Sequence, residues 1–329
     1  MNKPMNDDAK SLQVMAELGA ATCLEDLYPV LHANRYTAGW HKKTPSLWKE
    51  PRKTYLPQHW RYREARLAMD RAGEWISTEL AERRNLLMFN PVEGNEYATA
   101  RSIVSAYQMI KGKEYAKTHR HTPNALRLIL DTKPGVFTVV NGVKLPMNPG
   151  DVLLTPNWSW HSHYNEGEAN GYWIDFLDVP LVHLLEPMFF EVQEGDTQPV
   201  TSEPAQSEFA FPQAWAEAHL ARMAPDAHGV RRLVLPTVQH MPSMHLAHAL
   251  IPKGGRTGVS RSTAHRIFAV MKGEGSARIG EQEFHWEFGD TLVVPGWTHF
   301  EFSASEEALL FQVNDEPLMR MLGFYRQES

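Results

Sequence analysis

Two pairs of histidines are the strongest chemical signal in this chain: His119 with His121, and His161 with His163. Because successive side chains of a β-strand point to opposite faces, the two imidazoles of each pair would lie on the same side. Three imidazoles from two neighbouring strands can hold one metal ion and leave its other positions open for substrate and oxygen. With 16 histidines in 329 residues, about one such pair is expected by chance, so the prediction depends on both pairs together. Solvated surface histidines are the alternative.

The residues that lead into the second pair resemble the second metal motif of the cupin β-barrels, G-x5-P-x-G-x2-H-x3-N. Trp158 replaces the central glycine, and the other fixed places hold Gly150, Pro156, His161 and Asn165. By this offset His161 is the third ligand, and His163 either supports the ligands from behind or faces the substrate. Strand geometry alone would allow either histidine to bind the metal.

The first cupin motif usually has a glutamate three or four residues after its H-x-H pair. Those places hold Ala125 and Leu126 in this chain. The resemblance therefore implies a site made of histidines alone, with His119, His121 and His161 as the ligands.

Composition limits the class of protein. Hydrophobic residues make up 43% of the chain and charged residues 22%, which predicts a globular protein with a full core. The net charge is −6 and no Lys/Arg-rich block occurs, so we expect neither nucleic acid nor a membrane surface as a partner. Cys23 is the only cysteine, which favours a reducing compartment. The sequence shows no apolar leader or membrane-spanning run, and the expected location is the cytoplasm.

Apolar spacing predicts helices within residues 8–33 and 62–80, separated by segments that contain proline. From about Ser102 the chain changes to short runs rich in Val, Ile, Phe and Tyr. Turn signals such as Asn141-Gly142 interrupt these runs, which predicts β-hairpins. A further helix is expected near residues 212–223.

An internal repeat predicts the architecture. Five residues recur without a gap at an offset of 139 (150 to 289): Gly150, Asp151, Leu153, Pro156 and Trp158 return as Gly289, Asp290, Leu292, Pro295 and Trp297. The same offset relates Arg127 to Arg266. We therefore expect a mainly β bicupin, with two double-stranded β-helix (jelly-roll) barrels and an N-terminal helical region. The expected divisions are a helical region over residues 1–80, a metal-binding barrel over 81–185, a linker with a helix over 186–235 and a metal-free barrel over 236–329.

The second copy of the repeat lacks the metal ligands. At the same offset, the three ligand positions hold Gly258, Ser260 and Phe300. His265 and His299 lie off these positions, and we expect structural roles for them. One metal ion per chain is therefore expected, in the first barrel.

Four segments carry a resemblance to one family: residues 82–91, 119–127, 154–163 and 173–180. They resemble the gentisate 1,2-dioxygenase family of bicupins, which also includes salicylate and 1-hydroxy-2-naphthoate dioxygenases. The resemblance implies a non-haem Fe(II) enzyme that inserts both atoms of O2 into an aromatic ring. Cleavage would fall between the carboxylate-bearing carbon and the adjacent hydroxyl-bearing carbon. The implied partners are a small aromatic acid and O2, and the implied assembly is a homo-oligomer, either a tetramer or a dimer.

The residue types agree with this chemistry. Three neutral imidazoles leave a ferrous ion its full +2 charge, which a carboxylate and an ortho phenolate could chelate and neutralise. A buried carboxylate also needs a partner of its own. Arg127 has the strand parity of His119 and His121, and its planar guanidinium suits a carboxylate. The alternative roles of Arg127 are an interior ion pair or a surface position.

The resemblance implies roles for further residues. Arg83 would lie near the substrate carboxylate or the oxygen site, whereas the sequence alone equally allows a solvated charged turn at Arg83 and Arg84. Ala106 and Gln108 would line the pocket, with Gln108 donating a hydrogen bond to a substrate oxygen. His163 is our candidate for acid–base work on the phenol or on the oxygen intermediate, because an imidazole can change charge near neutral pH. Asp175 could orient His163 or a ring hydroxyl.

Two departures from the family bear on the substrate. Asn85 stands where a small apolar residue is common, and Phe176 stands where a glycine is frequent, so both are expected to shape the pocket. Polar partners at Asn85 and His163 favour gentisate or a 5-substituted salicylate, such as 5-nitrosalicylate, over salicylate and then 1-hydroxy-2-naphthoate. The competing interpretations are a metal-dependent decarboxylase or isomerase, and a non-catalytic bicupin that binds a small aromatic acid.

Overall fold

The computed structural model describes residues 7–40, 46–78 and 83–328. The chain divides into two units, residues 1–52 and 53–329. The first unit holds the helices α1 (Asp7–Ala20) and α2 (Leu24–Ala33), which confirms the helical prediction for residues 8–33. In the first turn of α2, the Asp26 carboxylate accepts hydrogen bonds from the backbone N–H and the hydroxyl of Thr22, which lies between the helices. These bonds satisfy backbone groups where α1 has ended and α2 begins.

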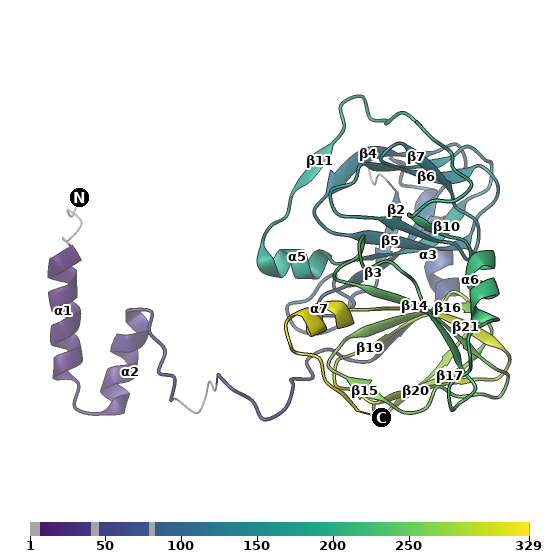
Figure 1. Cartoon of the computed structure of the whole chain (residues 1–329). Helices are drawn as coiled ribbons and strands as arrows, with labels where there is room; N and C mark the ends of the chain where they lie inside the picture. The colour runs from purple at the N-terminus through teal and green to yellow at the C-terminus, as the bar shows by residue number, and fades with distance from the viewer. Residues whose placement is uncertain (1–6, 41–45, 79–82, 329) are drawn as a thin grey trace. The chain divides into compact units, whose positions relative to one another are not determined.

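In the second unit, the first barrel is formed by two β-sheets (Figure 1). The larger sheet has the order β12-β8-β5-β10-β3-β2, with bounds Ala210–Phe211, Val152–Thr155, Ala125–Asp131, Gly171–Leu177, Val104–Ile110 and Arg84–Leu87. The smaller sheet has the order β11-β4-β9-β6-β7, with bounds Phe190–Val192, Tyr115–His121, His161–Asn165, Val136–Val140 and Val143–Pro146. Asn141 and Gly142 join β6 to β7 with φ values of 47° and 81°. A two-residue hairpin turn needs this left-handed backbone, so the predicted hairpin is confirmed.

The second barrel repeats this plan. Its larger sheet has the order β1-β19-β16-β21-β14-β13, with bounds Gln58–Trp60, Thr291–Val294, Arg266–Lys272, Ala308–Asn314, His245–Ile251 and Arg231–Val234. Its smaller sheet has the order β18-β17-β20, with bounds Gln282–Trp286, Gly275–Ile279 and Phe300–Ala304. A separate ribbon pairs β15 (Arg261–Ser262) with β22 (Gln327–Glu328).

Strand register reproduces the repeat seen in the sequence. Arg127 on β5 lies opposite Asp175 on β10, and Arg266 on β16 lies opposite Asn314 on β21. Each residue of the second pair follows its counterpart by 139 positions (127 to 266 and 175 to 314). The predicted mainly β bicupin is therefore present.

The two barrels share one hydrophobic core. Leu126 and Phe176 from the first large sheet lie in the same buried cluster as Ile267 and Phe311 from the second. The rings of Phe176 and Phe311 are 6.0 Å apart between centroids. Since side chains alternate along a strand, this shared core leaves the opposite face of β10, which carries Asp175, to the interior of the first barrel.

The structure adds detail to the expected divisions. The helix expected over residues 62–80 is seen as α3 (Tyr62–Gly73), and residues 79–82 lie outside the described chain. β1 precedes α3 and joins the second barrel by pairing with β19. The segment expected as a linker, 186–235, supplies strands to both barrels and contains α6 (Gln213–Leu220), where a helix was predicted.

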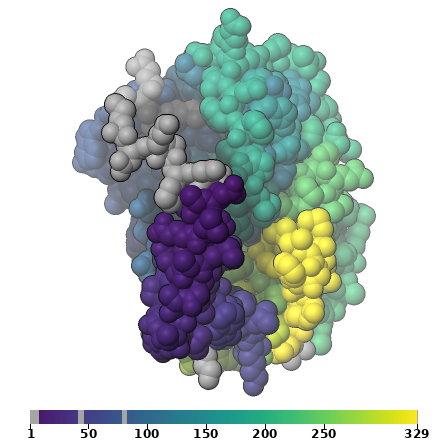
Figure 2. Space-filling model, turned by 90° about the vertical axis from the view of Figure 1, so that its left-hand side faces the viewer, coloured from purple at the N-terminus to yellow at the C-terminus, as the bar shows by residue number. Residues whose placement is uncertain are grey.

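Two short helices follow the last strands of the barrels, α5 (Val179–Leu185) after β10 and α7 (Glu316–Met321) after β21. An aspartate precedes each helix. Asp178 accepts a hydrogen bond from the backbone N–H of Asn124, and Asp315 accepts one from that of His265. The space-filling view shows the C-terminal segment, in yellow, at the surface (Figure 2). No helix among the described residues is long and apolar enough to cross a membrane.

Candidate metal centre

Three histidines come together on the smaller sheet of the first barrel. His119 and His121 lie on β4 and His161 lies on β9, where His161 pairs with His119 in register. One ligand atom from each ring lies within 4.8 Å of the other two. A bulge in β4 between Ala116 and His119 changes the register just before the ligand pair. Bulges of this kind re-aim side chains next to functional sites.

Each of these rings is held by a backbone carbonyl two residues away. The Nδ1 atoms of His119, His121 and His161 lie 3.0, 2.8 and 3.0 Å from the carbonyl oxygens of Lys117, Pro123 and Ser159. A carbonyl can only accept, so each Nδ1 carries the proton. The unprotonated Nε2 is then the metal-binding atom, which is the usual arrangement of a histidine ligand.

The protonation state of the rings also suits a metal. Burial, and next the neighbouring His119, lower the pKa of His121 to about 4. Burial holds the pKa of His161 well below its usual range, and its Nε2 atom is buried without a hydrogen-bond partner. Neutral imidazoles with inward Nε2 atoms fit a divalent transition metal with three histidine ligands and open positions. The three ligand predictions therefore agree with the geometry.

The loop before His161 keeps the backbone of the cupin motif although its glycine is missing. Trp158 has φ = 60°, and its repeat counterpart Trp297 has the same value. A bulky residue in this region is strained. The Arg120 guanidinium lies 4.4 Å from the Trp158 ring and 4.5 Å from the Trp160 ring, and this stacking offsets part of the strain.

The edge strand β11 covers one side of the centre. Phe190 packs on His119, with 5.4 Å between ring centroids. The next residue, Glu191, accepts hydrogen bonds of 2.8 and 2.6 Å from Arg120, which lies between the two ligands of β4. No sequence pattern indicates this contact, because β11 is short and its pairing with β4 is non-local.

A charged cluster lies on the facing large sheet. Arg127 Nε is 3.4 Å from Asp175 Oδ1, and both residues are 1% exposed. Arg83 Nη2 is 3.8 Å from Asp175 Oδ2, and Arg83 Nε donates to Gln108 Oε1 at 3.0 Å. The structure thus brings together four of the predicted site residues, with two guanidinium groups around one carboxylate.

Two further residues complete the cluster, and sequence reasoning gave neither of them a role. Thr155 on β8 accepts a hydrogen bond of 2.5 Å from Arg127 Nη1. The Trp173 indole N–H donates to Asp175 Oδ1 at 2.9 Å. Trp173 stands two places before Asp175 on the same strand. Because residues at this spacing share a face, the sequence could have predicted that Trp173 lies beside Asp175.

His163 lies apart from this carboxylate. Its ring is fully buried, 6.0 Å from the His161 ring and 5.6 Å from the Trp173 ring between centroids. Both of its nitrogens are buried without a hydrogen-bond partner. Burial, and next the Arg127 charge, hold the pKa of His163 well below its usual range. The geometry does not support the predicted orienting bond from Asp175, whose partners are Trp173 and the two arginines.

The other predicted pocket residues differ in position. Ala106 lies opposite Asp175 in register and is buried, so it faces the barrel interior. Asn85 lies opposite Gln108 on β2, but it is exposed. Phe176 is not brought to the site: it neighbours Asp175 in sequence, so it points to the opposite face, into the core shared by the barrels.

Comparison with known proteins agrees with these features. Residues 106–177 match the cupin domain. The chain is 30% identical to a gentisate 1,2-dioxygenase of Aquipseudomonas alcaligenes over 92% of this chain and 95% of that protein. It is 30% identical to a 5-aminosalicylate 1,2-dioxygenase of Comamonas sp. over 94% of this chain and 91% of that protein. The chain belongs to the gentisate 1,2-dioxygenase family.

A solved structure extends the likeness to three dimensions. A mutant salicylate 1,2-dioxygenase of Pseudoaminobacter salicylatoxidans in complex with gentisate superimposes with a TM-score of 0.87 at 26% identity, over 94% of this chain and 95% of that one. As a family member, the protein is a gentisate 1,2-dioxygenase-like ring-cleaving enzyme. This membership weighs against the decarboxylase, isomerase and non-catalytic interpretations.

In this family member the second barrel has lost the ligand set. His119, His121 and His161 form the one histidine group of metal-binding geometry found among the described residues. A Cβ atom at Gly258, the counterpart of His119, would lie 2.4 Å from His228 Nε2, so the His228 ring fills that space. His265 has structural contacts, since its Nδ1 accepts from the backbone N–H of Gly296 at 3.2 Å.

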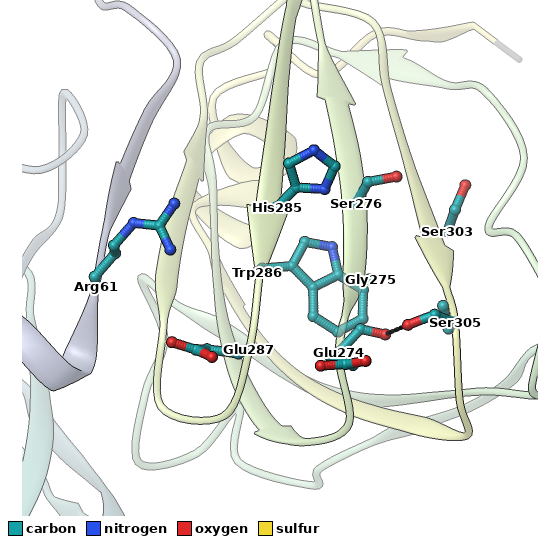
Figure 3. Close-up of a pocket in the computed structure, with 10 residues that line it drawn as sticks. Arg61, Glu274, Gly275, Ser276, His285, Trp286, Glu287, Ser303 and Ser305 are labelled. Carbon is teal, nitrogen blue, oxygen red and sulfur yellow. Dashed lines mark hydrogen bonds between the residues drawn. The ribbon is translucent and has the colours of Figure 1, made fainter.

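A separate cleft of about 440 Å³ lies over β17, β18 and β20 of the second barrel (Figure 3). Figure 3 shows His285 as its one histidine, with Arg61 on one side and the carboxylates of Glu274 and Glu287 below. A single imidazole is too few for a three-histidine site. The cleft is therefore no second copy of the metal centre.

Proposed function

We propose that this protein is an Fe(II)-dependent dioxygenase that cleaves the ring of a 2-hydroxybenzoate. Cleavage with O2 would fall between the carboxyl-bearing and the hydroxyl-bearing carbons. The observation that carries this proposal is the placement of three histidines opposite two arginines inside one barrel. A metal and an aromatic acid would find their partners on facing sheets.

His119, His121 and His161 would hold one iron per chain through their Nε2 atoms. When bound, Fe(II) supplies the redox chemistry that O2 needs and a positive centre for the carboxylate and phenolate oxygens. A histidine binds a metal as a neutral imidazole, so a centre with three histidine ligands keeps its charge for the substrate. The described ligand set contains no carboxylate that would compete with the substrate for that charge.

Arg127 and Arg83 would bind the substrate carboxylate. Their two positive charges surround the single negative charge of Asp175, so the cluster retains one net positive charge. A buried carboxylate is costly without a partner, and a planar guanidinium can meet it with paired N–H groups. The charge balance therefore favours an anionic substrate over a neutral phenol.

Two other side chains are suited to the ring oxygens. Gln108 uses its carbonyl oxygen to accept from Arg83, so its amide N–H groups are directed elsewhere and can donate to the substrate. His163 has two buried nitrogens without a hydrogen-bond partner, so one can accept a hydrogen bond from the phenol O–H and the other can donate one. We assign the proton transfer at the phenol oxygen to His163.

We favour a ring with a polar group at position 5, such as gentisate, 5-aminosalicylate or 5-nitrosalicylate. Two relatives with 30% identity are named for gentisate and for 5-aminosalicylate. Asn85, opposite Gln108 at an exposed position, would meet such a substituent. A fused second ring offers Asn85 no hydrogen-bonding group at this position.

The test is oxygen uptake by the purified, iron-loaded protein with gentisate, 5-aminosalicylate, 5-nitrosalicylate, salicylate and 1-hydroxy-2-naphthoate. We expect the 5-substituted acids to react fastest, then salicylate, then the naphthoate. Faster uptake with the naphthoate than with every 5-substituted acid would contradict the substrate assignment and leave ring cleavage intact. Absence of uptake with all five would contradict the proposed function itself.

A further inference from the structure

The Trp173 indole is a buried polar group that the proposed function has not used. Trp173 is 0% exposed and lies on β10, on the same face as Asp175. It forms part of a hydrophobic cluster of the first barrel, and its ring lies 5.6 Å from that of His163. A packing role alone would need only an aromatic ring. The indole N–H nevertheless donates to the central carboxylate of the site.

The contacts of Asp175 differ between its two oxygens. Oδ1 accepts from the Trp173 indole at 2.9 Å and lies 3.4 Å from Arg127 Nε. Oδ2 faces Arg83 Nη2 at 3.8 Å. The indole therefore fixes the rotation of the carboxylate, so that one oxygen serves each arginine. Without it, the carboxylate could turn and form a closer two-point pair with Arg127, which is the stronger geometry for these two groups.

The second barrel has the same fold without the indole–carboxylate pair. At the repeat offset, Trp173 and Asp175 correspond to Gln312 and Asn314, while Arg127 corresponds to Arg266. Asn314 there pairs with His245 at 3.1 Å. The arginine is thus kept in both barrels. The indole and the carboxylate occur together only where the histidine ligands occur.

We propose that Trp173 is a positioning residue whose indole N–H orients Asp175, and through it holds Arg127 and Arg83 apart for the substrate carboxylate. This inference rests on the proposed function, because it assumes that the arginines bind an aromatic acid. A hydrogen bond to a buried charge is strong enough for its loss to reduce kcat/KM about tenfold.

The chain offers a matched control in the metal-free barrel. Trp286 is 2% exposed, and its indole N–H is buried without a hydrogen-bond partner. Its ring lies 6.3 Å from Phe302, which is the repeat counterpart of His163. Trp286→Phe therefore makes the same change in size within the same fold, but it breaks no bond to a charged group.

The experiment compares Trp173→Phe, Trp286→Phe and Asp175→Leu, with the double variant Trp173→Phe/Asp175→Leu. We expect full iron content and similar falls in Tm for the two tryptophan variants, with the tenfold loss of kcat/KM confined to Trp173→Phe. In the Asp175→Leu background, Trp173→Phe should lower kcat/KM less than twofold, because its target is gone. Equal kcat/KM for the two tryptophan variants, or additive losses in the double variant, would overturn the proposal.

A second substitution covers the case in which phenylalanine disturbs the fold. Benzothienylalanine incorporated at position 173 has sulfur in place of the indole N–H and nearly the same shape. Calorimetric binding of 5-aminosalicylate without O2 gives a readout that does not depend on turnover, and we expect Kd to rise about tenfold. An unchanged Kd contradicts the positioning role. Lack of oxygen uptake by the unaltered enzyme would instead contradict the proposed function, so the two failures are distinguishable.

Discussion

The two barrels have the same fold, but the interior of the second is hydrophobic and that of the first contains buried polar residues. The second barrel fills the space between its sheets with a cluster of 15 buried hydrophobic residues, among them Phe300, Phe302 and Trp286. The corresponding cluster of the first barrel has eight, and the buried His161 and His163 stand at the places of Phe300 and Phe302. The strands and turns of a bicupin therefore do not depend on the site. The metal centre replaces hydrophobic core that the same scaffold can otherwise contain.

In the second barrel, hydrophobic residues stand at the positions of two histidines of the first barrel. Phe300 and Phe302 stand at the positions of His161 and His163, and both belong to the core of the second barrel. Two phenyl rings thus replace two imidazoles on adjacent inward positions of one strand. Burial of a phenyl ring stabilises a fold, whereas a buried imidazole without a partner is destabilising. Functional sites commonly reduce stability in this way.

The largest expected effect follows from this difference in ligands. Changing His119, His121 or His161 to alanine should abolish both iron binding and oxygen uptake, because two imidazoles are too few to hold the metal. Elemental analysis of the unaltered protein should give one iron per chain. His299→Ala in the second barrel changes an exposed histidine and should leave iron content and rate intact. Two irons per chain, or full iron content in His161→Ala, would contradict the ligand assignment.

The second effect concerns the arginine that both barrels retain. Arg127→Leu should keep its iron and lose kcat/KM by a factor of roughly 30 or more, since a buried carboxylate would lose its charged partner. Arg266→Leu is the matched control. Arg266 contacts Ser262 and lies 3.8 Å from Glu316, so its loss should lower Tm and leave kcat/KM within about twofold. If steady-state kinetics give equal losses of kcat/KM for the two variants, Arg127 has a structural role and does not bind the substrate carboxylate.

The sequence could predict the features that depend on local spacing. The His-x-His pairs, the hairpin at Asn141 and the 139-residue repeat all follow from alternation, turn chemistry or motif offset, and the structure agrees with each. The same alternation could have placed Phe176. A strand residue next to the inward Asp175 must face the other way, so the position of Phe176 follows from strand geometry and not from its place in a family motif.

Other parts of the site depend on contacts that no local pattern contains. Thr155 contacts Arg127 because β8 pairs with β5. Phe190 contacts His119 because β11, which is distant in sequence, pairs with the edge of β4. Asn85 lies opposite Gln108 but is exposed, since β2 is an edge strand. Strand order and exposure at an edge are set by the whole barrel, and spacing along the sequence cannot supply them.

The smallest expected effect concerns His248, a buried histidine of the second barrel that belongs to no metal site. His248 is 1% exposed, and neither ring nitrogen has a hydrogen-bond partner. It packs on Phe311, with 5.2 Å between ring centroids. Its counterpart at the repeat offset is Met109, which is 0% exposed. His248→Met would therefore give the second barrel the residue that the first barrel already has at this place.

Burial lowers the pKa of His248 from 6.5 to about 4. Because the folded state resists protonation, the protonation of His248 has no effect on stability above about pH 6.5, and stability falls as the pH drops from 6.5 towards 4. At pH 5 the unfolded histidine is protonated and the folded one is not, which destabilises the fold by about 2 kcal/mol. His248→Met removes this term, so urea unfolding should show the variant gaining about 2 kcal/mol over the parent between pH 8 and pH 5. If the stability difference between the two proteins stays constant over that range, His248 is protonated in the folded state and its burial does not exclude the proton.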